Sequence, residues 1–111
     1  MEIQFKKFDD NLVVYPIGEI DHHSSEELRT LIDKHFENSY AKNIIIDFQN
    51  ISFMDSSGIG MIIGRYKNAS KSGGTVVVVN VKESLKKIFT LSGLGKIIKI
   101  YPTVQDAINN I

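Results

Sequence analysis

Short apolar runs alternate with longer amphipathic stretches along the chain. Apolar and polar positions alternate over residues 3–8 and 12–17, and Asp9, Asp10 and Asn11 between them favour a turn, so an N-terminal hairpin is predicted. Pro16 has no N–H to donate, so we expect the second strand to be bulged there or to face a ladder edge. Residues 44–48 and 75–79 are apolar almost throughout, which is typical of strands covered on both faces. A last strand is expected over residues 97–101.

Four helices are predicted from apolar residues that recur every three or four positions. The first follows a loop at 18–23, begins with a capping box of Ser24 and Glu27, and runs for about four turns. The second follows a further loop, runs to about residue 72 and ends at Gly73 and Gly74, since glycine supplies a left-handed helix cap. The third covers residues 83–91, and the fourth covers 104–111.

This order of elements predicts an α/β fold in one domain spanning residues 1–111. Strands and helices alternate after the hairpin, which implies right-handed crossovers and a largely parallel sheet. We expect a mixed sheet of about five strands, with an antiparallel strand at its N-terminal edge, and about four helices.

Composition removes several functional classes. The 111 residues include no cysteine, so disulfide scaffolds, thiolate metal sites and cysteine nucleophiles are excluded. The 13 Lys and Arg balance 13 Asp and Glu. Neutral net charge argues against direct nucleic-acid binding. The late lysines are interpreted as a solvated face: Lys82, Lys86, Lys87, Lys96 and Lys99. No signal peptide or apolar run of roughly 18 residues is visible, so we expect a cytoplasmic protein that does not insert into membranes.

The least ordinary segment is residues 51–67, which joins a central strand to the second helix. Open α/β sheets place their sites at such strand ends. Asp55, Ser56 and Ser57 are all good N-cap residues, and a phosphate at a helix N-terminus finds free N–H groups and a favourable dipole. Three interpretations compete: plain helix capping with glycines for packing, a dinucleotide site using Gly58, Gly60 and Gly64, and a phosphorylation switch on Ser56 or Ser57.

The dinucleotide interpretation has weak support from the sequence. The glycines fall about ten residues past the preceding predicted strand, and Asn80 stands where an acidic residue is expected after the next strand. No Walker loop is present.

Catalysis is also not expected. Asp21, His22 and His23 could serve a serine nucleophile as orienter and base, but no nucleophile elbow exists. Three histidines without cysteine make a poor metal set, and His35 is expected to pack on the apolar face of its helix. Neither a metal nor a cofactor is predicted.

The sequence resembles a known family at six places. These are residues 53–60 (Phe-Met-Asp-Ser-Ser-Gly-Ile-Gly), 62–67 (Ile-Ile-Gly-Arg-Tyr-Lys), 18–23 (Gly-Glu-Ile-Asp-His-His), 73–74, 91–94 and 96–98. The Asp-Ser-Ser-Gly pattern resembles the STAS domain, shared by sulphate transporters and anti-sigma factor antagonists. The histidine pair and Gly-Arg-Tyr-Lys resemble the sporulation branch of the antagonists. Pro16 departs from the ordinary strand residue expected there.

The resemblance implies a regulatory binding protein, not an enzyme. In that family the unphosphorylated form binds an anti-sigma factor that is also a serine kinase, and so releases the sigma factor. The kinase phosphorylates the first serine of the pair, here Ser56, and a PP2C-type phosphatase reverses this. The free protein is expected to be a monomer. The partner-binding surface implied is Asp21, His22, His23, Asp55, Ser56, Ser57, Gly58 and Gly60.

Some questions stay open at this stage. Spacing alone does not choose between Ser56 and Ser57; with Ser56 modified, Ser57 fits a structural cap of the helix. Gly58 and Gly60 could serve helix packing or close approach of a kinase. The alternative function is a flavodoxin-like domain that binds a small ligand or nucleotide at the same helix N-terminus.

Overall fold

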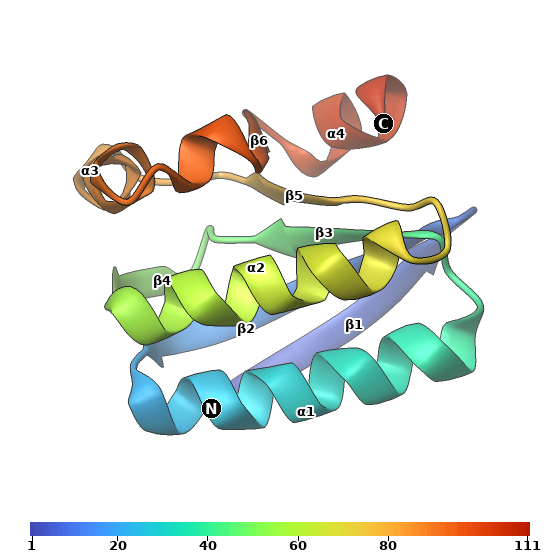
Figure 1. Ribbon diagram of the computed structural model, residues 1–111, viewed down its shortest axis with the longest axis horizontal. Helices are drawn as coiled ribbons and strands as arrows, with labels where there is room; N and C mark the ends of the chain where they lie inside the picture. Colours follow the sequence, from blue (N-terminus) through green and yellow to red (C-terminus); the bar gives the residue numbers. More distant parts are fainter.

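A computed structural model describes residues 1–111 and contains six strands, four α-helices and one 3₁₀ helix (Figure 1). In chain order these are β1 (Glu2–Phe8), β2 (Asn11–Ile20), α1 (His22–Ser39), β3 (Asn43–Asp47), β4 (Ile51–Met54), α2 (Ser56–Ser70), β5 (Val76–Val79), α3 (Glu83–Leu91), η1 (Leu94–Lys96), β6 (Lys99–Tyr101) and α4 (Val104–Asn110).

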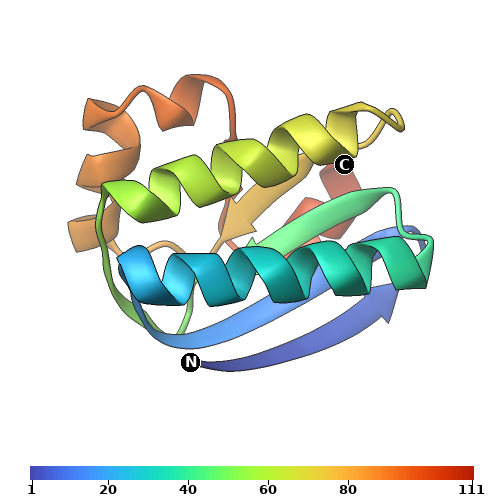
Figure 2. The same ribbon diagram turned by 60° about the horizontal axis from the view of Figure 1, so that its bottom comes forward.

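The strands form one mixed sheet, which confirms the predicted α/β fold class. Its order is β1-β2-β3-β5-β6, with β1 antiparallel to β2 at the edge and the remaining pairs parallel. The short strand β4 lies off this path and pairs in parallel with the last part of β2. Helices α1 and α2 run side by side over one face, while α4 lies on the opposite face (Figures 1 and 2).

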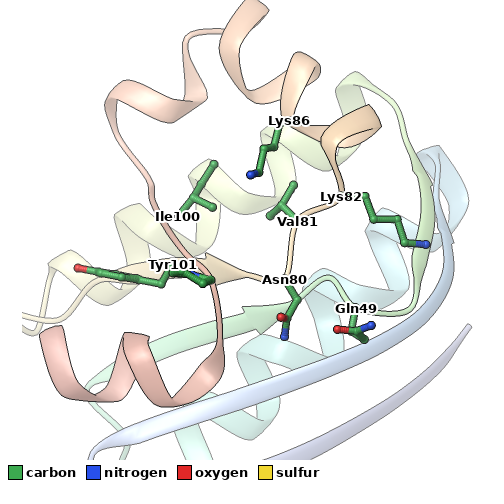
Figure 3. Close-up of a pocket in the computed structure, with 8 residues that line it drawn as sticks. Gln49, Asn80, Val81, Lys82, Lys86, Ile100 and Tyr101 are labelled. Atoms are coloured by element: carbon green, nitrogen blue, oxygen red, sulfur yellow. The ribbon is translucent and has the colours of Figure 1, made fainter.

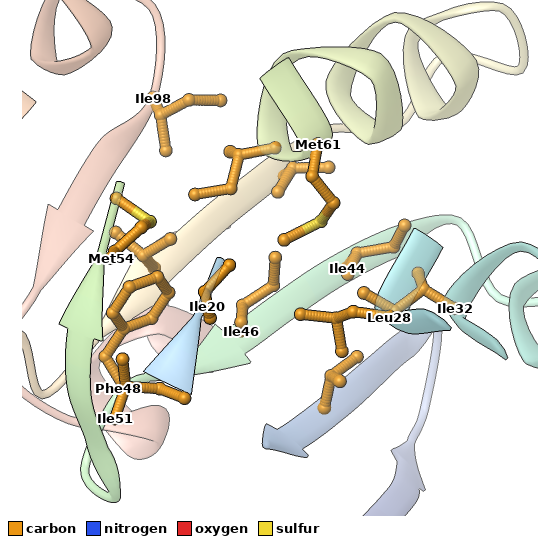
Figure 4. Packing of buried hydrophobic residues seen from close by; sticks show 14 of the residues in the cluster. Ile20, Leu28, Ile32, Ile44, Ile46, Phe48, Ile51, Met54, Met61 and Ile98 are labelled. Carbon is orange, nitrogen blue, oxygen red and sulfur yellow. The ribbon is translucent and has the colours of Figure 1, made fainter. Parts of the chain in front are cut away.

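Two apolar clusters, one on each face of the sheet, account for the buried strands. The larger joins alternate positions of β2, β3 and β5 to α1, α2 and α3, and Figure 4 shows its centre around Ile20, Ile46 and Met54. The smaller gathers the opposite face of those strands beneath Ala107 of α4. Strand β3 is therefore covered on both sides, as its nearly continuous apolar run predicted.

Strand β4 is the strand that the sequence did not predict. Residues 51–54 were expected to be part of a loop, but they pair with Gly18, Glu19 and Ile20. Those three residues were also expected in a loop and instead extend β2. Only Ile51 and Met54 are buried within β4, because Ser52 and Phe53 face outward. A four-residue strand with half its side chains exposed carries little hydrophobic signal.

The capping box at the start of α1 was predicted one turn too late. The N-cap is Asp21, whose carboxylate accepts from the Ser24 backbone N–H at 2.9 Å, while the Ser24 hydroxyl accepts from the Asp21 N–H at 2.9 Å. Glu27, the expected partner of Ser24, instead pairs with the N-terminal ammonium group at 3.0 Å. The helix consequently gains a turn at its start.

Pro16 lies where β2 changes partners on one side. Residues 11–14 pair with β3, residues 18–20 pair with β4, and the ladder is irregular between Gly18 and Glu19. Pro16 pairs with neither β3 nor β4, so it faces a gap in the ladder, as one of the two expectations had it, while the bulge lies further along the strand and not at the proline. On its other side Pro16 stands opposite Ile3 of β1.

The predicted end of α2 at the glycine pair is confirmed in outline. Gly73 has a φ of +81°, and the Gly74 N–H donates to the Ala69 carbonyl at 2.9 Å. A Cβ on Gly74 would collide with the backbone carbonyl of Lys42, so this position accepts only glycine without a shift of the chain.

None of the helices combines the length and the apolar character that a membrane span requires.

Candidate functional site at the start of two helices

The carboxyl ends of β2 and β4 bring two helix starts together. Ile20 pairs with Met54 in parallel register, so the residues that follow them, Asp21 and Asp55, leave the sheet at the same edge. The Asp55 backbone N–H donates to the Ile20 carbonyl at 3.1 Å. Asp21 caps α1 and Asp55 caps α2. Residues 34 positions apart in the sequence thus form one surface.

The cap of α2 is Asp55, which revises the role expected of Ser57. The Asp55 carboxylate accepts from the Ser57 backbone N–H at 2.8 Å, so Ser57 receives the cap instead of supplying it. The Ser56 side chain is exposed, and its hydroxyl makes no hydrogen bond within the protein. Ser57 is half-buried. The two serines therefore differ in access, a distinction that spacing alone did not provide.

Asp21 is held as a carboxylate by its local hydrogen bonds. The Ser24 backbone N–H and the Ser24 hydroxyl both donate to it, and these bonds lower the pKa of the Asp21 carboxyl below its ordinary value. His22 and His23 follow as the first residues of α1, with both side chains exposed. The predicted partner-binding residues on β2–α1 therefore lie beside those on β4–α2.

The two glycines of α2 have different surroundings. Gly58 is buried, and a Cβ there would lie 2.6 Å from Met54 Sδ and 3.0 Å from Ile20 Cγ2. Gly60 is exposed, with nothing within 4 Å of such an atom. Packing therefore explains Gly58, whereas Gly60 leaves open surface beside the serines.

The glycines of α2 lie closer to the end of a strand than the sequence predicted. With β4 present, Gly58 falls four residues after a strand end and not ten. The packing of Gly58 against the strand ends gives this glycine a structural explanation without a ligand. Asn80 follows β5 as expected, so an acidic residue is still missing there.

A polar hollow of about 380 Å³ lies between the first halves of α1 and α2. Its lining includes the predicted residues His22, Ser57 and Gly60, together with Ser25, Glu26, Arg29, Met61, Gly64 and Arg65. Ser25 and Arg65 are 6% and 7% exposed. Neither residue is among the predicted site residues, because only the packing of α1 on α2 buries them.

Arg65 is the one buried cation of this region, and its partner is Asp33 on α1. The Nε–Oδ1 distance is 2.8 Å, although the two atoms are not aligned for a hydrogen bond. Burial lowers the pKa of the Arg65 guanidinium, and the charge of Asp33 opposes that change. A basic residue within the Gly-Arg-Tyr-Lys motif was the available signal, but nothing in the motif indicates burial.

A second hollow, of about 420 Å³, lies beyond the ends of β5 and β6. Its lining includes Gln49, Asn80, Lys82, Lys86 and Tyr101, and in Figure 3 Lys82 and Tyr101 extend away from each other. None of the predicted site residues lines it. Its side chains do not converge on one point, so it is a weaker candidate than the edge formed by β2 and β4.

Two lesser predictions are confirmed. The His35 ring stacks on Phe5 with ring centroids 3.7 Å apart, so this histidine packs against an apolar side chain as expected, although it stays exposed. The five late lysines are all exposed, which agrees with a solvated face.

The site thus lies on a mixed sheet that starts two helices from adjacent strand ends and carries an antiparallel strand at its N-terminal edge. The chain belongs to the STAS domain family, whose profile matches residues 2–107. It is 33% identical over 111 residues to an anti-sigma F factor antagonist of Paenibacillus polymyxa. The matched region covers all of this chain and 95% of that protein.

Solved structures give the same result. The anti-sigma factor antagonist SpoIIAA in its unphosphorylated form is similar with a TM-score of 0.83 and 31% identity, over 97% of this chain and 94% of that one. The Bacillus cell fate determinant SpoIIAA in the phosphorylated form is similar with a TM-score of 0.73 and 31% identity, over 97% of each chain.

Proposed function

We propose that this protein is an anti-sigma factor antagonist whose binding is switched off by phosphorylation of Ser56. Its unphosphorylated form binds an anti-sigma factor that is also a serine kinase, and this releases the sigma factor. The kinase transfers phosphate from ATP to Ser56, and a PP2C-type phosphatase restores the free hydroxyl. The process regulated is sporulation-specific transcription in the cytoplasm, and the free protein is a monomer.

The observation that carries the proposal is the position of Ser56. It is an exposed serine in the first turn of α2, next to the cap Asp55 and beside the second cap Asp21. A kinase can reach its hydroxyl without opening the fold. The similarity to SpoIIAA supports this interpretation, because that protein is described in unphosphorylated and phosphorylated forms.

The choice of Ser56 over Ser57 rests on accessibility and on the family match. The Ser57 backbone N–H is held by Asp55, and its side chain lines the hollow between α1 and α2. A kinase that phosphorylated Ser57 would have to reach a half-buried hydroxyl between α1 and α2. Ser56 is exposed, so a kinase can reach its hydroxyl from solvent.

Electrostatics explains why the phosphate would act on binding and not on folding. A phosphate adds about −1.5 to −2 charges, and the α2 N-terminus with its partial positive charge tolerates them. A partner surface built for a neutral hydroxyl would instead have to bury a dianion next to Asp55 and Asp21. A loss of about 3–4 kcal/mol weakens affinity by two to three decades, and like-charge crowding can supply it.

Phosphorylation of the purified protein by its cognate kinase, with the site mapped by mass spectrometry, tests the proposal. We expect phosphate on Ser56 in the wild type and in Ser57→Ala, and none in Ser56→Ala. The Ser56→Ala protein should still bind the kinase, and Ser56→Asp should fold but bind poorly. Phosphate on Ser57, or on neither serine, would overturn the assignment.

A further inference from the structure

The hollow between α1 and α2 holds an unusual set of polar groups. Ser25 forms part of its wall, is 6% exposed, and its Oγ has no hydrogen-bond partner. A buried hydroxyl without a partner costs stability, so an unpaired one calls for an explanation. Because a hydroxyl can rotate toward an acceptor, the Ser25 Oγ–H is available to donate a hydrogen bond to a ligand in the hollow.

Two guanidinium groups line the same hollow. Arg65 of α2 is 7% exposed, and Arg29 of α1 lies across from it, half-exposed and paired with Glu26 at 2.9 Å. Burial lowers the pKa of Arg65, and the positive charge of Arg29 lowers it further, whereas Asp33 and Glu26 raise it. Both guanidinium groups line one hollow, Arg29 beside Glu26 and Arg65 beside Asp33, so an oxyanion between the two arginines would interact with two positive charges.

We propose that this hollow binds a single oxyanion, a phosphate or a carboxylate group, through Ser25, Arg29 and Arg65. Arginine presents a planar fork of donors that matches both groups. The space of about 380 Å³ accommodates either one. Glu26 competes with the oxyanion for Arg29, and Asp33 competes with it for Arg65. Both carboxylates make the site weak in the free protein.

The ligand would sit close to the switch. Ser57 and Gly60 line the same hollow, one and four residues beyond Ser56. The site therefore offers an anchor for an anionic group adjoining the surface that carries the modified serine. It stands on its own residues and does not depend on which serine is phosphorylated.

An NMR titration tests the site directly. Sodium phosphate and sodium acetate would each be added to the whole protein at constant ionic strength, with sodium chloride as the reference salt. We expect saturable shifts of the Arg29 and Arg65 Nε–H signals and of the Ser25 amide. Saturation by phosphate identifies a phosphate group as the ligand, and preferential saturation by acetate identifies a carboxylate. Shifts no larger than those in chloride would overturn the proposal.

Matched variants separate a built site from the general field of the helix. Arg29→Gln should weaken binding roughly fivefold, while Lys34→Gln, which removes the same charge from α1 outside the hollow, should leave it unchanged. Glu26→Gln should strengthen binding several-fold, while Glu37→Gln should not. If the two variants of each pair change the affinity for the oxyanion equally, the shifts report net charge only, and the proposed site is overturned. Ser25→Ala should fold and bind more weakly than the wild type.

Discussion

The backbone N–H of Asp55 donates to the carbonyl of Ile20 at 3.1 Å. This bond ties the residue that begins α2 to the last residue of β2. Because Asp21 follows Ile20 directly, the same bond holds the cap of α1 beside the cap of α2. The exposed hydroxyl of Ser56 is thereby fixed on a surface made from two distant parts of the sequence.

Gly58 should not accept a side chain. A Cβ there would lie 2.6 Å from Met54 Sδ and 3.0 Å from Ile20 Cγ2, so Gly58→Ala should force the buried Met54 side chain out of its present position. We expect a loss of about 1–3 kcal/mol in the free energy of unfolding, measured by urea denaturation. Gly60→Ala is the matched control, since its Cβ would meet nothing, and it should stabilise the helix by about 0.5–1 kcal/mol. Equal effects at the two positions would contradict the packing described for Gly58.

Acid should destabilise the protein in part through Asp21. Hydrogen bonds from Ser24 lower the pKa of this carboxyl in the folded state, so its stabilisation is present above the unfolded pKa and is lost as pH falls through the folded pKa. Asp21→Asn keeps a good capping residue but cannot titrate. Its free energy of unfolding should therefore fall less than that of the wild type between about pH 7 and about pH 3.

The control for this measurement is Asp10→Asn. Asp10 is exposed in the β1–β2 turn, and its carboxylate accepts no hydrogen bond. If Asp10→Asn and Asp21→Asn alter the acid dependence equally, the hydrogen bonds of Ser24 are not the cause.

The sequence predicted elements well where burial is continuous. Strand β3 is apolar on both faces, and helix α3 begins and ends at the residues expected. It failed at β4, because Ser52 and Phe53 face outward and leave only two buried residues to mark the strand. At α1 two capping patterns overlap, Asp21 with Ser24 and Ser24 with Glu27. Only the point at which β2 ends decides between them.

The residues of the candidate site also fall into those that the sequence indicates and those that only the fold reveals. Asp55 and Ser56 could be found because helix caps have a local signature. Ser25 and Arg65 could not, because their burial arises where two helices pack together across 40 residues of sequence. A serine on a helix and an arginine within a motif look like ordinary surface residues until that packing is known.

The pair formed by Arg65 and Asp33 should hold α2 against α1. Arg65→Met leaves Asp33 without its partner and should lower the free energy of unfolding by about 2–3 kcal/mol. The double variant Arg65→Met with Asp33→Leu removes both charges and should recover much of that loss. Urea denaturation of the two single variants and the double variant measures the coupling. A double variant whose loss is the sum of the single losses would contradict the pairing.

The affinity of the cognate anti-sigma factor kinase for the protein, before and after phosphorylation of Ser56, tests the central claim most directly. Isothermal titration calorimetry should show tight binding of the unphosphorylated protein and a loss of about two to three decades in affinity for the phosphorylated one, with no loss of folded structure by circular dichroism. Equal affinity of the two forms would contradict the account.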